Sequence, residues 1–123
     1  MDYEYSVIGS VFCDAETLSA YSAISNSLFT YKDYSFALRK FGDRLSVSLC
    51  DESDNGQEYC KKIPEAYVAE VCKQLSEKFA CTVSMRKGYE VYGNANVFNG
   101  GSDYEVIEEK WYDVEFDNGV QKR

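Results

Sequence analysis

Residues 112–117 read Tyr-Asp-Val-Glu-Phe-Asp, and this strict alternation constrains the fold more than any other feature of the chain. Successive side chains of a β-strand point to opposite faces of the sheet. The segment therefore predicts a strand that buries Tyr112, Val114 and Phe116 on one face. Its three carboxylates are then expected on the opposite, anionic face.

This strand ends a longer acidic stretch, residues 103–117, in which seven carboxylates accompany a single base, Lys110. Tyrosines accompany the acids, and tyrosine gives an interface contact area at a low cost in side-chain entropy. We expect a partner-binding surface made of Glu105, Glu108, Glu109, Asp113, Glu115, Asp117, Tyr104 and Tyr112.

A second acidic segment, residues 51–58, contains four acids, no base and an Asn-Gly turn signal. It predicts an exposed loop or a hairpin tip. Its acids form a second predicted binding patch: Asp51, Glu52, Asp54 and Glu58. If the first strand lies beside the last one, the anionic segments merge into one face.

The overall charge narrows the range of partners. Thirteen lysines and arginines face 21 acids, a net charge of −8. Such a charge opposes direct binding to nucleic acid or to an anionic membrane, and it favours a basic protein partner. The N-terminus has no signal-peptide pattern and no run of eighteen apolar residues occurs, so we expect a cytoplasmic protein, in the host cytoplasm if the gene is carried by a phage.

The first half of the chain predicts a strand, a helix and a hairpin. Alternation from Tyr3 to Cys13 is typical of a central strand, and residues 15–29 carry apolar side chains at helical intervals. Residues 34–50 alternate on both sides of Gly42, which predicts a hairpin.

The second half predicts a helix and two or three strands. The helix spans residues 64–79 and starts at Pro64, which suits a first helical turn. Strands are predicted at 82–86 and 89–92, with a turn at Lys87-Gly88, and a last strand or strand pair at 104–116.

Together these elements predict one α+β domain covering residues 1–123. Its antiparallel sheet would have five to six strands with both helices on one face, in a ferredoxin-like βαββαβ order with an added strand.

Catalytic and metal-binding patterns are weak in this chain. It contains no histidine, which removes the commonest general base and every His-bearing metal site. The five cysteines form no C-x-x-C pair, so reduced thiols are favoured over a zinc site, and Cys60 beside two lysines is the candidate for a reactive thiol. Residues 51–62 imitate a calcium loop, but Lys62 stands where a bidentate Glu is required. We therefore expect no catalytic residue, metal or cofactor.

In composition the chain resembles the small acidic phage-encoded inhibitors of host nucleases, including anti-CRISPR proteins that mimic DNA. No motif assigns it to a family. The resemblance implies a non-enzymatic inhibitor whose carboxylates occupy the Lys/Arg-lined channel of a nucleic-acid-guided or DNA-binding nuclease. The residues leave three alternatives open: an immunity protein that neutralises a toxin, a housekeeping protein-interaction domain and, less favoured, a histidine-free enzyme. A monomer and a homodimer are both compatible with the sequence.

Overall fold

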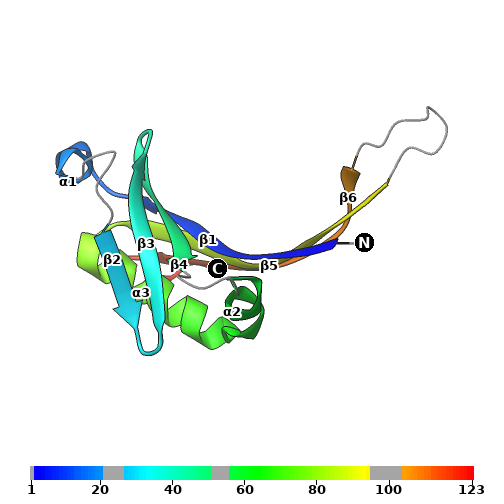
Figure 1. The fold of residues 1–123 in the computed structure, drawn as a ribbon. Coiled ribbons are helices and arrows are strands. Elements are labelled where there is room, and N and C mark those ends of the chain that lie inside the picture. Colours follow the sequence, from blue (N-terminus) through cyan, green and yellow to red (C-terminus); the bar gives the residue numbers. More distant parts are fainter. Residues whose placement is uncertain (1, 21–26, 51–55, 95–103) are drawn as a thin grey trace.

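The structure is a computed structural model that describes residues 2–20, 27–50, 56–94 and 104–123. They form a small α+β fold, an antiparallel sheet of seven strands with three helices (Figure 1). The strands lie side by side in the order β2-β3-β4-β1-β5-β6-β7. The elements are β1 (Asp2–Phe12), α1 (Ala15–Ser19), β2 (Ser27–Tyr31), β3 (Tyr34–Phe41), β4 (Arg44–Cys50), α2 (Gly56–Lys62), α3 (Glu65–Phe79), β5 (Thr82–Asn94), β6 (Tyr104–Asp117) and β7 (Val120–Gln121).

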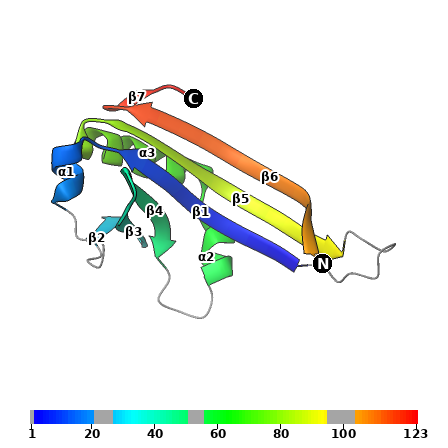
Figure 2. The same cartoon turned by 90° about the horizontal axis from the view of Figure 1, so that it is seen from above.

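The sheet has one face towards the helices α2 and α3 and one face that these helices leave open. In Figure 2 the open face of β1, β5 and β6 turns towards the viewer, and α2 and α3 lie behind the strands. We call the open side the outer face and the other the helix side. None of the helices in the described ranges is long and apolar enough to cross a membrane.

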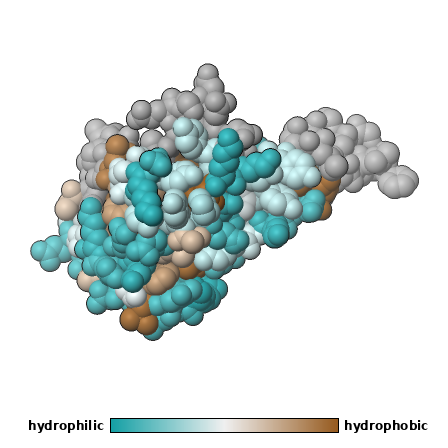
Figure 3. Space-filling model, turned by 90° about the horizontal axis from the view of Figure 1, so that it is seen from below, coloured by the Kyte–Doolittle hydropathy of each residue, from teal (hydrophilic) through white to brown (hydrophobic). Residues whose placement is uncertain are grey.

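Three strands continue beyond the body of the molecule as an arm (Figure 1). β1 pairs with β4 only from Ile8 to Val11, whereas it pairs with β5 along its whole length. We define the arm as residues 2–7 of β1, 87–94 of β5 and 104–112 of β6. The surface seen from the helix side is mostly hydrophilic, with small separate apolar patches (Figure 3).

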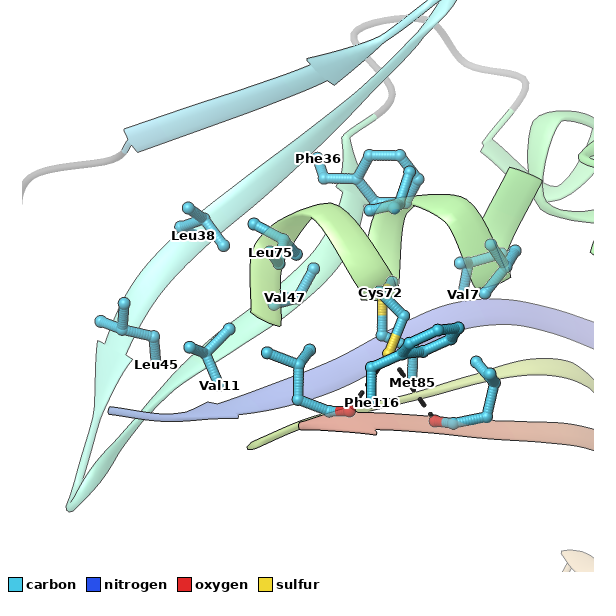
Figure 4. Close-up of a cluster of buried hydrophobic side chains, with 14 of the residues drawn as sticks. Val7, Val11, Phe36, Leu38, Leu45, Val47, Cys72, Leu75, Met85 and Phe116 are labelled. Carbon is cyan, nitrogen blue, oxygen red and sulfur yellow. Dashed lines mark hydrogen bonds between the residues drawn. The ribbon is translucent and has the colours of Figure 1, made fainter. Parts of the chain in front are cut away.

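The core forms where the amphipathic helix α3 packs on the sheet. Val68, Val71, Cys72 and Leu75 repeat at helical spacing and are fully buried. They meet apolar side chains from the central strands, among them Met85 (Figure 4). Each fully buried aliphatic side chain of this kind stabilises the fold by about 1.5–3 kcal/mol.

The ends of α3 follow from local chemistry. Pro64 is the N-cap, with φ −65°, and Ala80 closes the helix in the left-handed conformation at φ 49°. Its backbone N–H donates to the carbonyl oxygens of Ser76 and Glu77, which satisfies the last turn.

Two tight turns close hairpins, of which the first was predicted and the second was not. Gly42 takes φ 61° between β3 and β4, as the sequence predicted. Asn118 and Gly119 both have positive φ, 46° and 85°, between β6 and β7, and this is the backbone of a type I′ hairpin turn.

Three predictions of secondary structure were wrong. The helix predicted over 15–29 ends at Ser19, and Ser27–Tyr31 is an edge strand paired with β3. The turn predicted at Lys87-Gly88 does not exist, because β5 continues through it and Gly88 faces Trp111 of β6. Residues 56–58, predicted as loop or hairpin tip, begin helix α2.

The sheet therefore has seven strands rather than five or six. After β1 and the short α1, the strands β2, β3 and β4 form a meander that returns to β1 from one side, while β5 flanks β1 on the other. The ferredoxin-like order and the pair of helices predicted on one face, the first of them at 15–29, are not confirmed.

Candidate functional site

Strand β6 carries the predicted acidic surface, and its second half alternates as the sequence requires. Val114 and Phe116 are buried under α3, and Tyr112 is half-buried beside them. Asp113, Glu115 and Asp117 occupy the alternate positions and lie on the outer face.

The strongest anionic feature is a row of three glutamates across the arm. Glu4 lies directly opposite Glu90, and Glu90 lies directly opposite Glu109. Directly opposed side chains share one face of a sheet with their Cβ atoms about 4.5–5.5 Å apart, and like charges at such positions repel. We call Glu4, Glu90 and Glu109 the glutamate row.

The hydroxyl of Tyr92 lies close enough to the glutamate row to be affected by its charge. It donates a 2.8 Å hydrogen bond to Oε2 of Glu90. This bond is the main reason why the pKa of Tyr92 is raised, and the charges of Glu4 and Glu109 raise it further. No lysine or arginine in the described part of the chain forms an ion pair with these three carboxylates.

Glu108 does not join this row, because it alternates with Glu109 and points to the helix side. There the Tyr89 hydroxyl donates to Oε1 of Glu108 at 3.4 Å. Burial raises the pKa of Tyr89, and the neighbouring charge of Glu108 adds to the effect. The Tyr89 ring also packs on Tyr3 and Tyr5, with centroid distances of 5.5 and 5.6 Å.

Two carboxylates of β6 already have partners within the protein. Oδ1 of Asp113 lies 3.4 Å from Nε of Arg86. Oε1 of Glu115 accepts a 2.7 Å hydrogen bond from the Ser84 hydroxyl and lies 3.5 Å from the Arg123 guanidinium. Arginines thus partly neutralise these two acids, whereas Glu90 and Glu109 accept hydrogen bonds from the neutral groups of Tyr92 and Trp111 and keep their charge.

The other predicted site residues fall into two groups. Tyr112 belongs to the core margin, where burial raises its pKa, so it lies on the side opposite the acids. Tyr104 and Glu105 lie in β6 and Glu58 in α2, but their side chains are not described, and the remaining predicted residues lie outside the described ranges: Asp51, Glu52 and Asp54.

Glu4 and Glu90 were missing from the predicted site. The first and last long strands are not neighbours, because β5 lies between them and brings Glu90 and Arg86 into the face. The alternation of residues 2–12 predicts that Glu4 and Val7 lie on opposite faces of the sheet. The alignment of Glu4 with Glu109 could not be predicted in this way, because it depends on pairing between distant segments.

A cavity of about 550 Å³ opens on the outer face, next to the arm. It lies between the tip of the β3–β4 hairpin and the strands β1 and β5. Figure 1 shows the hairpin tip standing above the level of β1. The cavity is lined by three exposed apolar residues, the buried residues Val47 and Met85, four serines, two arginines, Asp113 and Gly9.

Three of the described thiols have the opposite character to that of a nucleophile. Burial raises the pKa of Cys13, raises that of Cys72 to about 12 and raises that of Cys81 to about 11. A nucleophilic cysteine needs a lowered pKa. No group of three or more acids or thiols in the described segments is arranged to hold a metal ion.

Comparisons with protein-family models, with curated proteins and with solved structures found no match to this chain.

Proposed function

We propose that this chain is a non-enzymatic binding protein whose anionic sheet face blocks the basic surface of a nucleic-acid-binding enzyme. The observation that carries the proposal is the glutamate row. Folding sets three carboxylates in direct register, and no described cation neutralises them. The repulsion among them costs stability, and a cationic partner would relieve it.

The spacing of the carboxylates supports a lysine- or arginine-lined partner. Outward positions of β6 recur every second residue, about 6.6–6.8 Å apart, and neighbouring strands add carboxylates about 4.8 Å to the side. One strand of nucleic acid carries a charge about every 3.4 Å along the helix axis. A single β-strand thus has about half of that charge density, and the row across the arm increases it.

Within the described ranges, no strand covers the β6 edge of the arm. β7 pairs with β6 only at Phe116 and Asp117, so the edge of residues 104–114 has no partner strand in the described part of the chain. Charged side chains at 108–110 and 113 are exposed along this edge, and charges of this kind discourage two edge strands from pairing. This favours a monomer over a homodimer joined through β6.

The test is a pull-down with the tagged chain from a lysate of its source cells, at low and at moderate salt, followed by mass spectrometry and an activity assay of the recovered protein. We expect a basic nucleic-acid enzyme that dissociates as salt rises and is inhibited by the chain. The decisive variant is E4Q/E90Q/E109Q, which should lower recovery by slowing association.

The matched control removes the same number of charges from other surfaces, with Glu16, Asp33 and Glu65 replaced by their amides. All three side chains are exposed. Equal recovery with both triple variants would overturn the proposed role of the glutamate row. Recovery of a basic toxin in place of a nucleic-acid enzyme would assign the chain as an immunity protein.

A further inference from the structure

The cavity on the outer face has a floor of small side chains. Ser46, Ser10 and Ser84 lie in register across β4, β1 and β5, and Ser48 lies one row further towards the arm. Ser84 uses its hydroxyl on Glu115. The hydroxyls of Ser10 and Ser48 form no hydrogen bond with any residue that the structure describes. The floor thus offers room and free hydroxyl groups.

The walls of the cavity are apolar and exposed. Phe12, Ile8 and Phe41 line it with 45 %, 43 % and 70 % of their surface accessible. Phe41 comes from the hairpin tip, and the other two come from β1. Large apolar side chains around a concave site of 300–1,000 Å³ are typical of small-molecule pockets.

Two guanidinium groups line the same cavity in a chain that is otherwise strongly acidic. Arg44 lies over the Phe12 ring, 5.5 Å from its centroid, and Arg86 lies over Trp111. Both Nε atoms are buried and have an aspartate oxygen 3.4 Å away, outside hydrogen-bonding geometry. About 40 % of each arginine side chain remains accessible.

The charge of the lining is positive. Arg44 and Arg86 face one lining carboxylate, Asp113, which already neutralises part of Arg86. The ion-pair partner of Arg44, Asp43, does not line the cavity and has 90 % of its side chain exposed, so solvent screens that pair strongly. Arginine holds carboxylate and phosphate groups through two parallel N–H bonds.

We propose that this cavity is a binding site for a small amphiphilic anion, a molecule with an apolar body and one carboxylate or phosphate head. The body would pack on Phe12, Ile8 and Phe41. The head would receive hydrogen bonds from Arg44 or Arg86 and from the free serine hydroxyls. This site lies beside the glutamate row but uses other residues and the opposite charge, so it is independent of the proposed inhibitor function.

The test is a titration of the isotope-labelled full chain, followed by amide chemical shifts, with four probes: octanoate, octyl phosphate, 1-octanol and inorganic phosphate. We expect saturable shifts at residues 8–12, 44–48 and 84–86 for octanoate or octyl phosphate. The neutral alcohol and inorganic phosphate should bind at least about tenfold more weakly, since each lacks one of the two interactions. The stronger of the two anionic probes identifies the head group.

Variants separate the charge of the site from its shape. R44Q/R86Q should weaken binding of the anionic probe about tenfold or more and leave that of 1-octanol unchanged. The control K78Q/K122Q removes the same charge outside the cavity and should bind as the original chain does. S10L fills the floor without a change in charge and should abolish binding of all apolar probes.

Two results would overturn the proposal. One is the absence of saturable shifts at the cavity with every probe. The other is equal anion affinity in R44Q/R86Q and in the K78Q/K122Q control, with the amide spectrum of the rest of the chain unchanged in both.

Discussion

The guanidinium carbon of Arg86 lies 4.0 Å from the centroid of the Trp111 ring. This contact joins β5 to β6 across the position of Gly88, which lies opposite Trp111. It stands between the two parts of the outer face, with the glutamate row on the side of the arm and the cavity on the other. The stack therefore holds Arg86 in place at the cavity.

We expect the two side chains to be energetically coupled. A double-mutant cycle with R86Q and W111L, measured by urea unfolding, should give a coupling free energy of about 0.5–1 kcal/mol, the range for partly exposed cation–π pairs. Purely additive effects, with a coupling below about 0.3 kcal/mol, would show that the contact contributes nothing of its own.

The glutamate row should destabilise the isolated chain. Because Glu90 has a like charge directly opposite on both sides, E90Q should raise the free energy of unfolding by about 0.2–1 kcal/mol at low ionic strength. The gain should shrink in 1 M salt, where the screening length is about 3 Å. D33N, which removes an exposed acid from a turn outside the row, serves as the control. A gain for E90Q that does not depend on salt would rule out repulsion as its cause.

Local sequence patterns were sufficient to predict those elements whose residues lie close together in the chain. The alternation at 112–117, the hairpin around Gly42 and the helix after Pro64 each depend on residues close together in the chain, and the structure confirms all three. The helix predicted at 15–29 failed because apolar residues at helical intervals also fit an edge strand. Leu28, counted towards the helical face, lies 57 % exposed on β2.

The candidate sites depend on the pairing of distant strands, which local sequence patterns do not contain. Glu4 and Glu109 become members of one row only through the register of β1, β5 and β6, and this pairing joins residues from both ends of the chain. Arg44 and Arg86 likewise come from a hairpin tip and a central strand. The sequence shows the excess of acids. It does not show which glutamates form the row or which arginines meet at the cavity.

The continuity of β5 rests on Gly88. A Cβ at this position would collide with the backbone carbonyl of Lys110 and come within 2.7 Å of Cε3 of Trp111. G88A should therefore destabilise the chain by about 1–3 kcal/mol in urea unfolding, as overpacked sites do. The matched control is G93A, whose Cβ would meet the end of the flexible Ile107 side chain at 2.6 Å. Ile107 can turn away, so G93A should cost clearly less, and equal losses would contradict this account of Gly88.

Cys72 should make the fold sensitive to alkaline pH. The thiol is fully buried, and its Sγ donates to the carbonyl oxygens of Val83 and Val114 at 3.1 and 3.8 Å (Figure 4). Burial raises its pKa from the usual 9.0 to about 12, so the unfolded chain releases this proton first as the pH rises. The contribution of the protonated thiol is complete below pH 9 and is lost progressively between pH 9 and pH 12.

In that interval this one group should lower the free energy of unfolding by up to about 1.4 kcal/mol per pH unit. Urea unfolding of the original chain and of C72V, under reducing conditions between pH 8 and pH 10.5, measures the effect. C72V keeps an apolar side chain of similar size but has no proton to lose, so its stability should fall less steeply above pH 9. The raised pKa values of Tyr89, Tyr92, Cys13 and Cys81 act in the same direction in both proteins and cancel in the difference. Parallel curves would mean that the buried thiol ionises as easily in the folded chain as in the unfolded one.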